Sequence, residues 1–119
     1  MKRIGREAAR LLGSEDAWRD DLVVVASGYA GPAYGVPDRG TLEAIGCAAR
    51  LEALVLDPVY SGKGMAGLIG LVRGGRFGPG DEVIWLHTGG HPGLFAYPGA
   101  AAAAAAIAAE PAGPSRRLP

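Results

Sequence analysis

Three short apolar runs alternate with two amphipathic segments along the chain. The runs at 21–26, 54–56 and 82–87 are rich in valine, leucine and isoleucine and are too short to form helices that stand alone. Apolar residues recur at three- and four-residue spacing over 41–51 and 61–73, which predicts two helices. The order strand, helix, strand, helix, strand predicts an α/β fold: a parallel sheet with right-handed βαβ crossovers.

Local signals set the bounds of these elements. Asp38 or Thr41 can cap the first of the two helices, and the glycine pair at 74–75 ends the second. Pro58 ends the middle strand because proline has no amide hydrogen for a β-ladder. A further short amphipathic helix is predicted over residues 4–12.

The C-terminal stretch 99–119 departs from this pattern. Seven consecutive alanines at 100–106 favour a helix but offer little area to bury, and the proline-rich sequence after Glu110 is typical of disorder. We therefore expect one α/β unit over residues 1–98, followed by an alanine- and proline-rich tail over 99–119 that is partly disordered.

Composition and charge exclude several classes of function. A chain of 119 residues, of which 49% are apolar, can form one small domain. Twelve lysines and arginines balance twelve aspartates and glutamates, so no net field attracts nucleic acid or an anionic membrane. The sequence has neither a signal peptide nor an apolar run of membrane-spanning length, so we expect a cytoplasmic protein. A lone Cys47 rules out an internal disulfide.

Polar residues gather where the predicted strands end. Tyr60 and Ser61 follow the second strand, and Thr88, Gly89 and Gly90 follow the third. Because the carboxyl ends of parallel strands meet at one edge of a sheet, this edge is a candidate ligand pocket. Structural roles are the alternative: the tyrosine ring can cover the core, the serine can cap a helix, and the glycines can form a tight turn.

Two further motifs are weak. Lys63 lies in Ser-Gly-Lys-Gly, which lacks the complete Walker pattern of a phosphate-binding loop. The only two histidines, His87 and His91, are separated by glycines that disfavour a helical metal clamp, and no cysteine or carboxylate lies nearby. We expect no metal site.

Several motifs stand in fixed order along the chain. They are Tyr-Gly-Val-Pro at 34–37, Leu-Asp-Pro-Val-Tyr-Ser-Gly-Lys-Gly-Met at 56–65 and Leu-His-Thr-Gly-Gly-His-Pro-Gly-Leu-Phe-Ala-Tyr at 86–97. Over about residues 20–98 the sequence resembles the C-terminal third of the D-cysteine desulfhydrase and 1-aminocyclopropane-1-carboxylate deaminase family. The resemblance implies a pyridoxal-5'-phosphate enzyme of the tryptophan synthase β-like fold (fold type II), acting on a small amino acid and usually homodimeric.

The resemblance also implies roles for individual residues. Tyr34 and Tyr60 match catalytic tyrosines on the substrate side of the cofactor, which bind substrate and handle a proton; a nearby cation can lower the proton affinity of such a phenol. Ser61 and Thr88 match two positions beside the pyridine ring, and Gly89 lets backbone approach the cofactor. The deaminase branch carries Glu and Leu at those two positions, whereas the desulfhydrase branch carries hydroxyl residues. The implied reaction is β-elimination of D-cysteine to pyruvate, ammonia and hydrogen sulfide.

The matched motifs do not reach the N-terminal third of the family, which holds the lysine that forms the aldimine and most of the phosphate cradle. Lys63 does not match that lysine, so we expect a fragment that is inactive alone and whose aldimine lysine lies outside this chain. Three alternatives stay open: a 1-aminocyclopropane-1-carboxylate deaminase, another pyridoxal-phosphate lyase or racemase, and a noncatalytic α/β module that binds a small ligand or a subunit.

Overall fold

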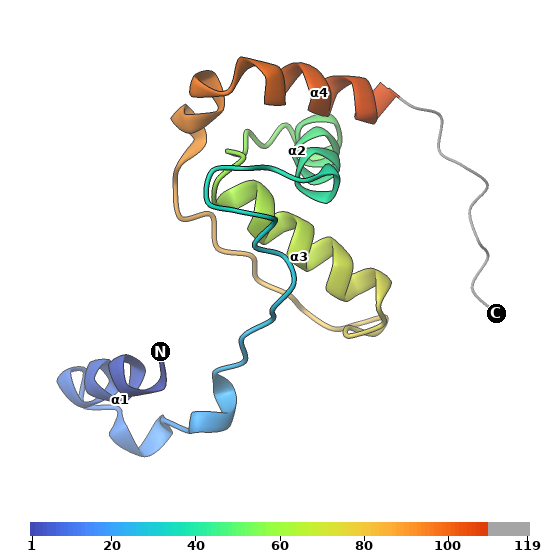
Figure 1. Cartoon of the computed structure of the whole chain (residues 1–119). Helices are drawn as coiled ribbons and strands as arrows, with labels where there is room; N and C mark the ends of the chain where they lie inside the picture. The colour runs from blue at the N-terminus through green and yellow to red at the C-terminus, as the bar shows by residue number, and fades with distance from the viewer. Residues whose placement is uncertain (110–119) are drawn as a thin grey trace.

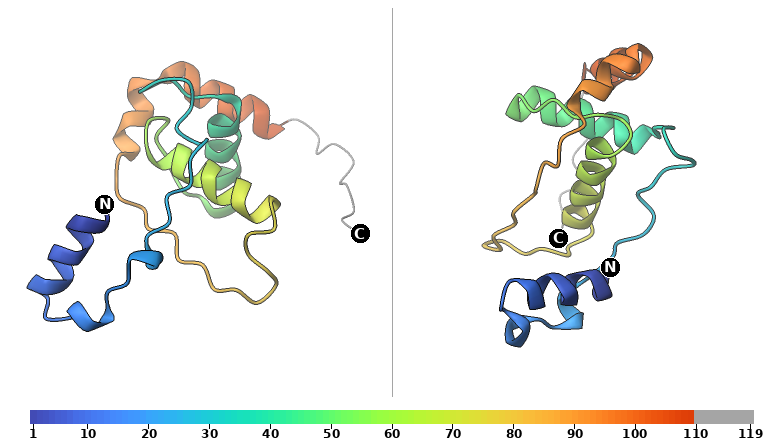
Figure 2. Two further views of the ribbon diagram at one scale, coloured as in Figure 1. Left: turned by 60° about the horizontal axis from the view of Figure 1, so that its bottom comes forward. Right: turned by 90° about the vertical axis from the view of Figure 1, so that its left-hand side faces the viewer.

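The computed structural model describes residues 1–109, and the structural statements below refer to that part of the chain. It contains four α-helices and three short 3-10 turns: α1 (Lys2–Leu11), η1 (Glu15–Ala17), η2 (Asp20–Leu22), α2 (Arg39–Glu52), α3 (Ser61–Arg73), η3 (His91–Ala96) and α4 (Pro98–Ala109). Helix α2 packs against both α3 and α4, while α1 lies apart from these three (Figures 1 and 2). None of the described helices is long and apolar enough to span a bilayer.

The predicted parallel sheet is absent from the described residues, so the α/β prediction is wrong for this structure. Segments 21–26, 54–56 and 82–87 contain no strand, and the one isolated β-bridge within residues 1–109 joins Ala33 to Val36. The reason is that a strand is stabilised by ladder bonds to neighbouring strands, and these three segments do not pair with one another. Their composition shows that these segments could fit into a β-sheet. A strand forms only when a neighbouring strand is present to pair with it.

Helix α2 begins and runs as the sequence predicts. The carboxylate of Asp38 accepts hydrogen bonds from both the amide of Thr41, at 2.8 Å, and its hydroxyl, at 2.7 Å. The two candidate capping residues therefore act together. On one face of the helix, Ala44, Ile45 and Ala48 are buried. That face positions the core on which the candidate site is built.

Helix α3 is also confirmed, and its glycines have a packing role. The ring of Tyr29 lies directly on Gly67 and Gly70; a Cβ at Gly70 would stand 2.6 Å from the tyrosine ring. The core beside it contains Ile45, Ala48, Leu56 and Ala104, with Met65, Trp85 and Leu94 packed against its edge. This small core holds the start of α3 against α2.

The alanine-rich segment forms α4 and covers α2. Ala100 and Ala104 are buried, and the backbone of Ala104 lies against Gly46 of α2, where a side chain would collide with it. The sequence predicts this helix, but its alanine side chains indicate that it buries little apolar area. Small side chains on both helices allow the two backbones to come close. Van der Waals contact between the backbones then stabilises the pair in place of contact between large side chains. The predicted disorder after Glu110 lies outside the described residues, and the division at residue 98 stays a prediction.

Candidate functional site

A buried carboxylate organises the start of α3. Asp57 is 1% exposed, and its side chain accepts the amides of Val59 at 2.7 Å, Tyr60 at 2.8 Å and Ser61 at 2.8 Å. These amides are unpaired at a helix N-terminus, so the carboxylate satisfies donors that the helix leaves free. Asp57 thereby fixes the backbone that carries both Tyr60 and Ser61.

The same contacts decide the charge on Asp57. Burial raises the pKa of the carboxyl, but hydrogen bonds from Ser61, Tyr60 and Val59 together outweigh it and hold the pKa below its usual value. Asp57 is therefore ionised at neutral pH. Sequence reasoning missed this role, although a signal was present: an aspartate shortly before an apolar helical run is a common helix-start residue.

The Ser61 hydroxyl is engaged within the protein. It donates to the carboxylate of Asp57 at 2.5 Å and accepts the amide of the same residue at 2.8 Å. A hydroxyl has one proton to donate, and this one is committed to Asp57. Ser61 is the first residue of α3, and its hydroxyl bonds to Asp57 instead of capping the helix as the alternative from the sequence had it. Contact with a ring nitrogen would require the hydrogen bond to the carboxylate to break.

Tyr34 and Tyr60 come together in an exposed pair. Their hydroxyl oxygens are 2.6 Å apart, and the rings meet edge to face with centroids 5.9 Å apart. Both side chains are largely exposed, at 78% and 60%. The hydroxyl of Tyr97 lies close by, against Gly35. Two phenols joined by one hydrogen bond and open to solvent can pass a proton to or from a small bound molecule.

The pairing raises the pKa of Tyr60 rather than lowering it. The hydrogen bond to Tyr34 is the largest cause, and partial burial and the neighbouring charges of Tyr34, Asp57 and Tyr97 act in the same direction. No cation is among the groups that act on the Tyr60 phenol, so the lowering that a nearby cation could cause is not seen here. The ammonium group of Lys63 is bonded to backbone carbonyls instead.

The tyrosine pair gives a test by titration. We expect Tyr34→Phe to lower the pKa of Tyr60 toward the ordinary phenol value of about 10, because the hydrogen bond that stabilises the protonated form is lost. Carbon-13 NMR of labelled tyrosines resolves each ring during the titration. Tyr29→Phe is the matched control, since Tyr29 packs on α3 and should leave the Tyr60 titration unchanged. A Tyr60 pKa that does not move in Tyr34→Phe would contradict the pair.

Lys63 is a buried cation that fixes the loop carrying Tyr34. Its ammonium group donates to the carbonyls of Ala30 and Ala33, at 2.5 Å and 3.0 Å, and its side chain is only 8% exposed within α3. An open hollow of about 430 Å³, lined by Tyr34, Val59 and Lys63 among others, lies at this place. Lys63 is thus a structural partner of the loop, and its amine is not free.

The glycine loop after residue 87 reaches the same region. Gly90 has φ of 88°, and a Cβ there would stand 2.8 Å from the carboxylate of Asp57. Gly89, with φ of 97°, donates its amide to the ring of His87 at 3.1 Å. Thr88 is exposed on this loop. Tyr60, Ser61 and Gly90 therefore meet at Asp57 from two segments without a sheet edge, whereas no contact with Asp57 is seen for Thr88 or Gly89.

The described residues do not complete a site for pyridoxal phosphate. The sequence holds two lysines. Lys63 uses its amine on two carbonyls, and Lys2 is the first residue of α1, which lies apart from α2 and α3 (Figure 1). No free amine faces Tyr34 and Tyr60, and the Ser61 proton is committed elsewhere. Residues 1–109 also contain no group of three or more His, Cys, Asp or Glu side chains placed to hold a metal ion. Among the described residues, the candidate residues are thus left without a covalent anchor for the cofactor.

Comparison with known proteins identifies the family, although no family model matches the chain. Proteins named 1-aminocyclopropane-1-carboxylate deaminase are similar to it: 50% identical over 97 residues in Burkholderia vietnamiensis, 52% over 101 in Burkholderia cenocepacia and 48% over 95 in Ralstonia nicotianae. These matches cover 80–83% of this chain and 28–29% of the relatives. The chain thus spans less than a third of their length. It belongs to the 1-aminocyclopropane-1-carboxylate deaminase and D-cysteine desulfhydrase family of enzymes, as a partial member.

Proposed function

We propose that the chain supplies the substrate-facing part of a pyridoxal-phosphate-dependent lyase, and that activity requires the part of the family fold that it does not cover. The observation that carries the proposal is the exposed Tyr34–Tyr60 pair, with hydroxyls 2.6 Å apart. Asp57 fixes the backbone of Tyr60, and Lys63 fixes the loop of Tyr34. The backbone of both tyrosines is therefore held in place while their hydroxyl groups stay exposed to solvent. This is a suitable arrangement for holding and moving one proton at a small substrate.

D-cysteine is the substrate we propose. The support is the pair of hydroxyl residues Ser61 and Thr88. At the two matching positions, the deaminase branch of the family carries Glu and Leu. A carboxylate beside a pyridine nitrogen keeps that nitrogen protonated, whereas a hydroxyl does not, and the weaker electron sink suits loss of a thiolate. In the structure Thr88 is the exposed hydroxyl of the two, since Ser61 is bonded to Asp57.

1-Aminocyclopropane-1-carboxylate is the second candidate substrate. The names of the relatives favour it, since proteins about 50% identical carry the deaminase name. The two candidates share the tyrosine pair and differ in the bond that breaks. Only the D-cysteine reaction releases sulfide, so the products distinguish them.

The test restores the missing part. The chain is mixed with the polypeptide of the Burkholderia vietnamiensis relative from which the matched 29% has been deleted, together with pyridoxal phosphate. We expect sulfide from D-cysteine, and a rate lowered about 10²–10⁴-fold in Tyr60→Phe, the range for loss of a general acid–base group. Tyr29→Phe, in which the altered ring packs on α3, is the control and should keep the rate.

Other outcomes have defined meanings. Ammonia from 1-aminocyclopropane-1-carboxylate without sulfide from D-cysteine would establish the second candidate. Neither product from a stable complex would favour a noncatalytic module. An imine absorption band formed by the chain alone and lost in Lys63→Ala would contradict the structural role given to Lys63.

A further inference from the structure

The ring of His87 uses both of its nitrogens. Its Nδ1 accepts the amide of Gly89 at 3.1 Å, and its Nε2 lies 3.2 Å from the carbonyl oxygen of Val55. Because a backbone amide can only donate and a carbonyl can only accept, the one ring proton must be on Nε2. The two bonds therefore select a single tautomer of His87.

These bonds join two segments that both reach Asp57. Val55 lies just before Asp57, the buried carboxylate at the start of α3, and 32 positions before His87. Gly89 lies in the loop after residue 87, and a Cβ on its neighbour Gly90 would stand 2.8 Å from the Asp57 carboxylate. His87 thus ties this loop to the segment that leads to the same carboxylate.

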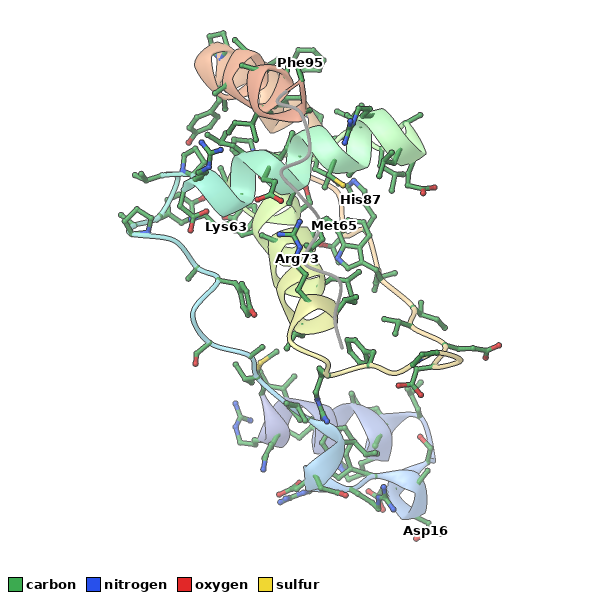
Figure 3. The ribbon with its side chains drawn as sticks, turned by 90° about the vertical axis from the view of Figure 1, so that its right-hand side faces the viewer. Asp16, Lys63, Met65, Arg73, His87 and Phe95 are labelled. Carbon is green, nitrogen blue, oxygen red and sulfur yellow. The ribbon has the colours of Figure 1, made fainter. Side chains whose placement is uncertain are left out.

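Neighbouring rings limit the movement of the imidazole. The rings of Trp85 and His91 each meet it edge to face, with centroids 5.3 Å and 6.0 Å away. Trp85 also packs against the core beside α3. His87 itself is half-buried at the end of the extended segment that runs past this helix (Figure 3). A side chain held by packing positions its hydrogen-bond partners more precisely than a mobile one.

We propose that His87 is a positioning residue that fixes the place of the Thr88 hydroxyl relative to Tyr60. Thr88 stands between His87 and Gly89 in the chain, so the bond between those two residues closes a turn around it. The bond to Val55 anchors that turn to the segment that leads into α3, where the backbone of Tyr60 is held. The inference rests on the proposed function, in which the Thr88 hydroxyl supports the choice of substrate. His87 acts through Thr88 and does not have to touch the substrate.

Nitrogen-15 NMR of the imidazole rings in the free chain tests the two bonds directly. At a pH where both rings are neutral, we expect His87 to be one tautomer with its proton on Nε2. His91 is exposed and serves as the internal reference, which should show the mixture of tautomers of an unrestrained ring. Because no reaction is measured, this result does not depend on the proposed function.

Two conservative variants separate the two bonds. The amide oxygen of asparagine can replace Nδ1 as an acceptor, whereas the longer glutamine can place its amide group where Nε2 donates. We expect hydrogen exchange at the Gly89 amide to stay slow in His87→Asn and to be about tenfold faster in His87→Gln, the effect of losing one ordinary hydrogen bond. Phe95→Ala, at a side chain 80% exposed on η3, is the control and should exchange as the parent does.

A double-mutant cycle tests whether His87 acts through Thr88. The full chain is combined with the truncated Burkholderia vietnamiensis polypeptide and pyridoxal phosphate, and the rate is measured with whichever substrate the parent complex converts. We expect His87→Ala and Thr88→Ala each to lower the rate about tenfold, and the double variant to lose no more than Thr88→Ala alone. A parent complex without any product is a failure of the proposed function, and the NMR and exchange results then decide the role of His87 by themselves.

Three results would overturn the proposal. They are the same mixture of tautomers at both histidines, exchange at Gly89 that is as slow in His87→Gln as in the parent, and independent, additive losses of rate in the double variant. The last result would mean that His87 supports the fold without setting the position of Thr88.

Discussion

Replacing Asp57 with alanine is expected to lower the free energy of unfolding by about 2–4 kcal/mol, a large fraction of the stability of a small domain. The carboxylate is buried and accepts three amides and one hydroxyl at the start of α3, and no other side chain takes its place. Urea unfolding followed by circular dichroism measures the loss. Asp81→Ala is the matched control: it caps the amide of Gly78 in an exposed turn, so its cost should stay below about 1 kcal/mol.

The same residue predicts a dependence on acid. The folded state holds the pKa of Asp57 below its usual value, so its contribution to stability is fully present above the unfolded pKa of about 3.9. That contribution is lost as the pH falls through the lower, folded pKa, because the proton must then be taken up inside the network. Asp57→Asn should start less stable and show a flatter acid profile.

Two other aspartates make the comparison informative. The pKa values of Asp20 and Asp38 are also held low, by side-chain hydrogen bonds from Arg6 and Thr41 respectively. Asp38→Asn should therefore keep the part of the acid profile that belongs to Asp57. If Asp57→Asn loses stability in acid as steeply as the parent, the buried carboxylate is not the group that titrates.

Local sequence patterns were sufficient to predict the helices. They were insufficient to predict contacts between residues far apart in the sequence. The spacing in 41–51 and 61–73 and the cap at Asp38 act within a few residues, and both helices formed as predicted. The run at 82–87 has the composition of a strand, but a ladder needs a neighbour, and none lies beside it in the described residues. The error in fold class has this single physical source.

The candidate site shows the same division. Tyr34 and Tyr60 could be named from motifs, yet their contact, and hence the direction of the Tyr60 pKa, depends on a loop folded across 26 positions. The role of Lys63 in fixing that loop could not be read from Ser-Gly-Lys-Gly, because its acceptors are backbone carbonyls around 30 positions earlier. Backbone acceptors leave no side-chain signature in a sequence.

The packing of α4 on α2 predicts a large effect of one substitution on stability. Two glycines of α2, Gly46 and Gly40, differ in what an added side chain would contact. A Cβ at Gly46 would collide with the backbone of Ala104 and stand 2.9 Å from the Cβ of Ala108. The nearest atom to a Cβ at Gly40 is the carboxylate oxygen of Asp38, at an ordinary 3.6 Å. The same substitution in one helix therefore meets a rigid backbone at one position and an ordinary van der Waals contact at the other.

We expect Gly46→Ala to lower the free energy of unfolding by about 1–3 kcal/mol, because α4 must move away from α2 to admit the methyl group. Gly40→Ala should raise it by several tenths up to about 1 kcal/mol, because alanine favours the helix and restricts the unfolded chain. Urea midpoints of the two variants against the parent measure both signs in one experiment. If Gly46→Ala is as stabilising as Gly40→Ala, the alanine-rich helix does not rest on α2, and the close approach of their backbones is not what holds it there.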